Sequence, residues 1–222
     1  MLSVLCSSDV NARDIFVQIL KLERLEDTPI ATTYRRGGWI FTFLKSELTA
    51  DHVEWINTNY IPERIYFPFF GYSIDLTHEV GDVIVANVFF PYNTNLDQLE
   101  VNESNRDTIV KDPLFLDYFD EQKDYYVEDF WLSVGGILVH GSPENPNDAL
   151  MTKMMLAYEA DAYITASLTE SLVPRETDDA SKIVIAGIIR GKTHAEKSHQ
   201  NPIEFTARNM VTAMKLLQDE EE

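Results

Sequence analysis

Gly81-Asp82-Val83-Ile84-Val85-Ala86-Asn87-Val88-Phe89-Phe90 is the stretch that decides the fold of this 222-residue chain. Gly81-Asp82 introduces the run Val83–Phe90, in which β-branched and aromatic residues dominate, and these residue types favour strands. The apolar side chains fall on both faces of such a strand. Two-sided hydrophobicity is typical of a strand buried at the centre of a sheet. The sequence therefore predicts a central strand over 83–90.

Strand and helix patterns alternate before this run. Ser3 to Cys6 is a short apolar run, and Ser7, Ser8 and Asp9 then offer side-chain oxygens for a helix N-cap. The apolar residues that follow have the i, i+3, i+4 spacing of one helix face: Ala12, Ile15, Phe16, Ile19 and Leu20. A strand that leads into a helix through small polar residues opens many α/β folds, in which ligands lie at the carboxyl ends of strands.

The segment between the first helix and the central strand predicts two further strands and a helix. Thr32 to Leu44 contains a Gly37-Gly38 break followed by an apolar run. Thr49 is positioned to cap a helix that extends to about Thr58. A β-rich run from Arg64 to Phe70 then ends in Gly71-Tyr72-Ser73.

The alternation continues to the end of the chain. Phe130 to His140 and Ile183 to Ile189 read as strands, and residues 161–172 mix strand and helix signals. Asn145-Pro146 and Asn201-Pro202 each read as an N-cap followed by a proline at the first helical position. The helix after Asn145-Pro146 carries an apolar stripe that reads as core or, alternatively, as a ligand surface: Met151, Met154, Met155 and Tyr158.

These patterns predict one α/β domain over residues 1–218, with a central, mixed and mostly parallel sheet flanked by helices. An acidic excursion interrupts it at about residues 93–129, and residues 219–222 form an acidic tail. The excursion reads as a solvated, partly helical surface segment anchored by its aromatic side chains, or as a lid or subunit contact. The sequence leaves these readings open.

Composition excludes several classes of function. With 37 acidic against 18 basic side chains and a net charge of −19, the chain is a poor candidate for binding nucleic acid or an anionic membrane. The single cysteine, Cys6, excludes an internal disulfide. We find neither a secretory signal nor a transmembrane run, so we expect a cytoplasmic protein that acts on small molecules or on another protein.

The common catalytic and cofactor motifs are missing, which leaves the ends of strands as candidate sites. The chain has no GxGxxG, P-loop, GxSxG or HExxH pattern, and its five histidines include no tight ligand pair. We therefore expect neither a metal nor a cofactor. Arg190 and Asp161 read as site residues or as salt-bridge partners, Asp9 as a helix cap or a base, and His194 as an exposed loop histidine or a general acid.

The order of the strand ends resembles the nucleoside phosphorylase and nucleosidase superfamily. Phe69 to Ser73 matches its glycine-rich strand end and Gly81 to Ala86 its Gly-Asp-Val-Ile strand. Further along, Gly135 to Gly141, Glu159 to Ala162 and Ile188 to Gly191 follow in the family's order. The resemblance extends from Ser3 to Leu217 and implies the fold of that family and action on an N-glycosidic bond.

The resemblance also implies positions for the site residues. The Met-Glu pair that packs on the ligand and binds the ribose hydroxyls in the family matches Ala160-Asp161. The acid that protonates the purine falls at His194, whose imidazole can still act as a general acid near neutral pH. The expected Gly-Asp after the 135–141 strand is Gly141-Ser142. We therefore expect His194 and Asp9 to be catalytic and a second set to bind ligand: Ser8, Gly71, Tyr72, Ser142, Ala160, Asp161 and Arg190.

Three functions are compatible with these residues. The first is a divergent nucleosidase or nucleoside phosphorylase acting on a purine or related nucleoside; the second is a noncatalytic relative that binds a nucleoside-like ligand or nothing. The third is an interaction protein whose working surface is the acidic excursion. Few arginines lie near strand ends, so hydrolysis or plain binding is favoured over phosphorolysis. The resemblance further implies a homo-oligomer.

Overall fold

The computed structural model describes residues 2–8, 10–90, 114–115, 121–141, 148–165, 183–191 and 202–219. Two compact units are present. Unit 1 comprises residues 1–68, 167–185 and 201–222, and unit 2 comprises residues 69–166 and 186–200. Two of the four passages of the chain between the units fall inside strands, namely β5 (Arg64–Tyr72) and β11 (Ile183–Gly191).

Unit 1 is a sheet with helices, in the strand order β5-β1-β4-β3-β2. β1 (Ser3–Ser7) pairs in parallel with β4 (Trp39–Leu44) and with the first part of β5. β3 (Ala31–Arg36) and β4 form a hairpin, and β2 (Glu23–Asp27) pairs antiparallel with β3 at the edge. The parallel arrangement brings the carboxyl ends of β1 and β4 to the same edge of the sheet.

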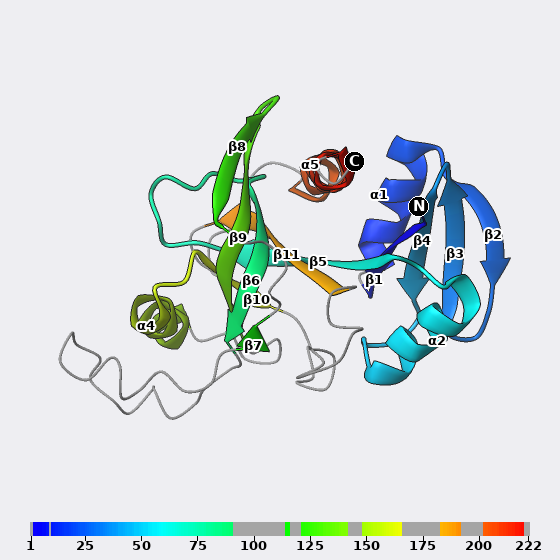
Figure 1. The fold of residues 1–222 in the computed structure, drawn as a ribbon, viewed down its shortest axis with the longest axis horizontal. Coiled ribbons are helices and arrows are strands. Elements are labelled where there is room, and N and C mark those ends of the chain that lie inside the picture. Colours follow the sequence, from blue (N-terminus) through cyan, green and yellow to red (C-terminus); the bar gives the residue numbers. More distant parts are fainter. Residues whose placement is uncertain are drawn as a thin grey trace. The chain divides into compact units, whose positions relative to one another are not determined.

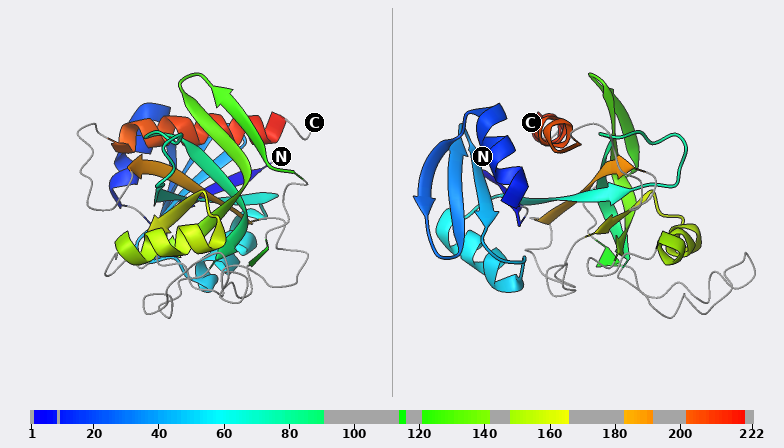
Figure 2. Two further views of the ribbon diagram at one scale, coloured as in Figure 1. Left: turned by 90° about the vertical axis from the view of Figure 1, so that its left-hand side faces the viewer. Right: turned by 180° about the vertical axis from the view of Figure 1, so that it is seen from behind.

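Helices α1 (Val10–Leu20) and α5 (Pro202–Asp219) pack against each other in unit 1 (Figures 1 and 2). The Phe16 ring of α1 lies 6.1 and 5.9 Å from those of Phe41 and Phe43 on β4, and burial of these apolar faces holds the helix to the sheet. The third helix, α2 (Ala50–Tyr60), begins after Thr49, whose backbone N–H donates to Nδ1 of His52 at 3.0 Å.

Unit 2 is organised around β6 (Val83–Phe90), which pairs in parallel with β9 (Phe130–Gly141) and antiparallel with β11. β9 pairs in parallel with β10 (Ala162–Thr165) and antiparallel with β8 (Lys123–Val127). β7 (Leu114–Phe115) pairs with the end of β6. The pairing of β6 with β9 shifts register at Gly135, whose φ of +84° is readily adopted only by glycine.

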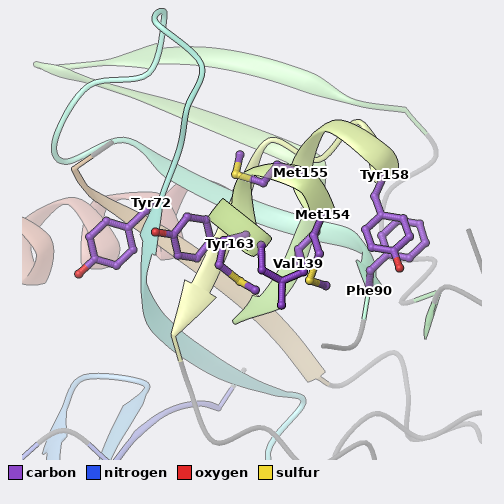
Figure 3. Close-up of a cluster of buried hydrophobic side chains, with 9 residues drawn as sticks. Tyr72, Phe90, Val139, Met154, Met155, Tyr158 and Tyr163 are labelled. Atoms are coloured by element: carbon purple, nitrogen blue, oxygen red, sulfur yellow. The ribbon is translucent and has the colours of Figure 1, made fainter. Parts of the chain in front are cut away.

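The core of unit 2 includes a cluster of buried aromatic, methionine and aliphatic side chains under helix α4 (Asp148–Tyr158). Figure 3 shows an aromatic pair at each end of this cluster, Phe90 with Tyr158 and Tyr72 with Tyr163. Met154, Met155 and Val139 lie between the two pairs (Figure 3). The methionine stripe is therefore core, one of the two readings that the sequence allowed.

Most predicted elements are confirmed, and the class is α/β with a mixed sheet, as expected. Parallel pairing is less prevalent than expected, because the β2–β3–β4 and β8–β9 segments add antiparallel pairs. Residues 123–127 of the acidic excursion form a strand, β8, which was not predicted from the sequence. Residues 91–113 and 116–120, most of that excursion, lie outside the described residues.

No helix in the described part of the chain is both long enough and apolar enough to cross a membrane.

Candidate functional site

The carboxyl ends of β5 and β11 lie next to each other in unit 2 and carry three of the predicted site residues: Gly71, Tyr72 and Arg190. The Ser73 backbone N–H, directly after β5, donates to the Gly191 carbonyl oxygen at 3.2 Å. A side chain at Gly71 would place its Cβ 3.2 Å from the Tyr163 carbonyl oxygen and 3.6 Å from that of Ile188. The backbones converge here because position 71 has no side chain.

Arg190 presents a cation at this edge. Its guanidinium carbon lies 5.2 Å from the centre of the Phe70 ring, within the range of a cation–π contact, and the residue is half-buried. The ion pairs among the described residues join Arg13 to Asp14 and Asp27 to both Arg24 and Lys45, so none of them uses Arg190. Among the described residues Arg190 thus has a cation–π contact and no ion pair, which is compatible with its predicted ligand-binding role.

Tyr72 is a core residue. Its side chain is buried, and its ring stacks on that of Tyr163 with 5.3 Å between the ring centres and an angle of 25° between the ring planes (Figure 3). Any contact of Tyr72 with a ligand is therefore made by its backbone or by the edge of a ring that is already packed.

Asp161 is held by two backbone contacts to β9. One of its carboxylate oxygens, Oδ2, accepts a hydrogen bond from the Ile137 N–H at 2.7 Å, and its own N–H donates to the Ile137 carbonyl oxygen at 2.9 Å. Burial raises the pKa of this carboxyl, while the Ile137 N–H and the charge of His78 act to lower it. Asp161 immediately precedes β10, so it lies at the amino end of that strand and not at its carboxyl end.

Ser73 and His78, which the sequence did not single out as site residues, form a hydrogen-bonded group with Asp161. Ser73 Oγ donates to the Asp161 carbonyl oxygen at 2.7 Å and accepts from the Asp75 N–H at 3.2 Å. It also lies 2.8 Å from His78 Nδ1. Since the single hydroxyl hydrogen is used toward Asp161, Nδ1 must carry the hydrogen of the His78 contact. Ser73 Oγ is thus saturated and links three segments, so it is not an activated nucleophile.

Asp82 of the Gly-Asp-Val-Ile strand has a comparable linking role. The residue is buried, and its two carboxylate oxygens accept from the backbone N–H groups of Glu79 at 2.7 Å and Trp131 at 2.8 Å. The aspartate of this motif therefore fixes the entry of β6 against the start of β9. The sequence signal was present as the Gly81-Asp82 pair, but only the partner Glu79 is local, and the other partner, Trp131, lies 49 residues away along the chain.

The remaining predicted residues are distributed as follows. Ala160 lies in the link between α4 and β10: its N–H donates to the Met155 carbonyl oxygen at 2.9 Å, after Glu159 with φ +51° has ended the helix. Ser8 is exposed and directly follows β1 in unit 1. Asp9, Ser142 and His194 lie outside the described residues, so the proposed catalytic pair stays a prediction.

Neither a metal centre nor an activated thiol is found in the described part of the chain. No group of three or more metal-ligating side chains comes together among the described residues. Cys6 is buried in β1, and burial raises the pKa of its thiol far above the usual range, so this thiol stays protonated and unreactive.

Comparison with solved structures places the fold among nucleosidases. The 5′-methylthioadenosine/S-adenosylhomocysteine nucleosidase of Colwellia psychrerythraea, solved in complex with adenine, has a TM-score of 0.63 and 12% identity, over 96% of this chain and 93% of that chain. The Campylobacter jejuni enzyme of the same name has a TM-score of 0.58 and 13% identity, over 98% and 97%. A mutant futalosine hydrolase of Helicobacter pylori has a TM-score of 0.53 and 8% identity, over 97% and 100%.

No protein-family model and no curated protein sequence matches the chain. The structural matches span nearly its whole length, so the chain has a nucleosidase fold, and the resemblance read from its strand ends is confirmed at the level of fold.

Proposed function

We propose that this protein binds a purine-type nucleoside or its base and acts on the N-glycosidic bond by hydrolysis. The observation that carries the proposal is the nucleosidase fold over nearly the full chain, including proteins solved with adenine or a nucleoside analogue. A shared fold does not by itself determine the reaction. The reaction depends on the side chains at the strand ends.

Cleavage of this bond builds positive charge on the sugar and negative charge on the leaving base. A protein that accelerates it needs a donor to the base, acceptors for the ribose hydroxyls and an activated water. We assign the donor to His194 and the activation of water to Asp9. Arg190, with its planar guanidinium at the end of β11, is assigned to ligand binding by stacking or hydrogen bonding.

Gly71 supports the same assignment because the lack of a side chain lets the backbones of Tyr163 and Ile188 come close to β5 at this strand end. The contacts of Asp161 support a positioning role between β9 and β10, since one carboxylate oxygen accepts from the Ile137 N–H and its own N–H donates to the Ile137 carbonyl oxygen. The proposal therefore uses Arg190 and Gly71 among the described residues and does not depend on Asp161.

Base release tests the proposal. Methylthioadenosine, adenosine and inosine are incubated with the protein, with and without phosphate, and the free base is quantified by chromatography. We expect base release without phosphate, and a decrease in kcat/KM of about ten-fold or more in Arg190→Gln. Arg35→Gln is the matched control, because Arg35 is exposed and its side chain donates only locally, to the Gly37 carbonyl oxygen at 3.3 Å. Equal loss in both variants would remove Arg190 from the site.

Binding without cleavage is the second candidate. It is favoured by the position of Asp161, because the acid that the family resemblance assigns to the ribose lies at the amino end of β10, where one of its oxygens accepts from Ile137. Under this candidate adenine or methylthioadenosine raises the unfolding temperature, and no base is released during prolonged incubation.

A homo-oligomer is part of the proposal. A subunit with a net charge of −19 must keep its acidic residues away from such an interface, or self-repulsion will oppose association. Light scattering at low and high salt tests this, and a monomer at both would contradict it.

A further inference from the structure

Unit 1 contains a pocket of about 220 Å³ that has no part in the proposed nucleoside chemistry. It lies between the end of α1, the β3–β4 turn with the start of β4, and α5. Its walls are almost entirely apolar. Trp39 and Phe41 come from the sheet, Leu20 from α1, and Val211 and Met214 from α5.

The pocket and the carboxyl end of β1 lie at opposite ends of the unit 1 sheet. β1 and β4 run in parallel, with Ser3 opposite Trp39 and Ser7 opposite Phe43. Four residues of strand, at about 3.3 Å each, correspond to roughly 13 Å between the level of Trp39 and that of Ser7. The predicted site residue Ser8 follows Ser7, so the pocket is separate from the strand end that carries it.

Two cations complete the lining of this apolar pocket. The Arg36 Nη1 donates to the carbonyl oxygen of Leu20, the last residue of α1, at 2.9 Å, which leaves most of its N–H donors for other partners. Lys215 of α5 is exposed. No carboxylate among the residues that the structure describes forms an ion pair with either side chain.

The lining selects for one class of small molecule. An apolar body gains free energy by leaving water for the Trp39, Phe41 and Met214 surfaces, and a volume below the roughly 300 Å³ of common ligand pockets limits its size. Arg36 and Lys215 both line this pocket, so their positive charges favour a ligand with a negative charge and disfavour one with a positive charge. Two cations without an ion pair to any described residue stand out in a chain with a net charge of −19.

We propose that this pocket binds a small hydrophobic carboxylate, with its aromatic or aliphatic body against Trp39 and Phe41 and its carboxylate between Arg36 and Lys215. The site is independent of the proposed nucleoside chemistry. If the lysine and arginine merely cover apolar surface with their stems, an uncharged ligand of the same shape binds equally well.

Trp39 itself reports binding. The chain has three tryptophans, and Trp55→Phe with Trp131→Phe leaves Trp39 as the only indole. This variant is titrated at neutral pH with phenylacetate and, separately, with the uncharged phenylacetamide, while Trp39 fluorescence is recorded. We expect a saturable change with phenylacetate and binding of the amide about ten-fold weaker, since charge-assisted hydrogen bonds are lost.

Two substitutions test separately how the positive charge of Lys215 and the apolar cavity contribute to binding. Lys215→Gln should weaken phenylacetate binding about ten-fold and leave phenylacetamide unchanged, whereas Lys123→Gln on β8, the same change outside unit 1, should alter neither. Val211→Phe should abolish binding of both by filling the pocket, and it keeps the proposal testable if Lys215→Gln fails to fold.

Equal affinity for the two ligands, or no saturable change with phenylacetate, would overturn the proposal. Nucleoside binding and base release are measured on the same proteins. Since the pocket is separate, failure of phenylacetate to bind leaves the nucleosidase proposal standing, and failure of nucleoside cleavage leaves the carboxylate site standing.

Discussion

Asp161 shows at the scale of one residue how position changes the role of a carboxylate. Its sequence neighbours suggest a ribose contact, yet in the fold it precedes β10 and accepts a hydrogen bond from the Ile137 N–H at 2.7 Å. Burial dominates its titration and raises the pKa of the carboxyl above its ordinary value of 3.8. Folding thus disfavours the charged form of this carboxyl relative to the unfolded chain.

Stability should therefore depend on pH through Asp161. Because its folded pKa is raised, its contribution is present below about pH 3.8 and is lost as the pH rises through the folded pKa. Asp161→Asn can still accept from Ile137 through its amide oxygen but does not titrate. The free energy of unfolding of the variant relative to wild type should thus increase with pH, measured by urea unfolding from pH 4 to 7.

Asp14→Asn is the control for this series, because Asp14 is an exposed carboxylate in α1. A difference between Asp161→Asn and wild type that is constant across the pH range would show that burial of the charge does not govern this group.

Gly136 makes the position of Asp161 possible. A Cβ at Gly136 would lie 2.9 Å from Asp161 Oδ2 and 2.7 Å from Ile84 Cγ2, both closer than side chains normally pack. Gly136→Ala should therefore destabilise the protein by about 1–3 kcal/mol, measured as the free energy of unfolding in urea. A loss below about 0.5 kcal/mol, the usual range of a surface substitution, would mean that β9 and β10 shift apart without cost.

At the scale of elements, the loop before β6 is fixed by side chains rather than by regular structure. Asp82 accepts from the Glu79 and Trp131 N–H groups, and Ser73 Oγ joins the end of β5 to Asp161. These contacts hold the start of β6 and β9 and the end of β5 at one end of unit 2.

Removal of the Asp82 carboxylate should show this directly. Asp82→Ala leaves two N–H groups without acceptors at a buried site and should cost about 2–4 kcal/mol of unfolding free energy. Asp82→Asn keeps one acceptor oxygen and should cost less. Equal effects of the two substitutions, measured by chemical unfolding, would contradict a role based on two accepted hydrogen bonds.

The sequence predicts well those elements whose buried residues form a local pattern of apolar side chains. Val83–Phe90 is apolar apart from Asn87 and forms β6 with the expected bounds, and α2 begins directly after Thr49, as predicted. β2, with the sequence Glu-Arg-Leu-Glu-Asp, carries no strand signal because all five residues are exposed and its stability comes from pairing with β3. β8 likewise carries no strand signal, because it is a mostly exposed strand in an acidic segment and is stabilised by pairing with β9.

The candidate site is less predictable than the elements, because its contacts join distant residues. Gly71 and Arg190 were expected at strand ends and lie at the adjacent ends of β5 and β11. The linking roles of Ser73 and Asp161 depend on an 88-residue separation that no local pattern encodes.

At the scale of the whole molecule, the nucleosidase fold spans nearly the entire chain while sequence identity to the solved structures reported above is 8–13%. Such divergence preserves the sheet and leaves specific side chains free to change. The net charge of −19 works against binding of free phosphate, which agrees with the proposal of hydrolysis over phosphorolysis.

Calorimetric titration with adenine tests the central claim most directly. We expect saturable one-site binding to wild type, about ten-fold weaker binding to Arg190→Gln and unchanged binding to Arg35→Gln. No heat of binding at millimolar adenine, or identical affinities of wild type and Arg190→Gln, would contradict a base-binding site at the carboxyl ends of β5 and β11.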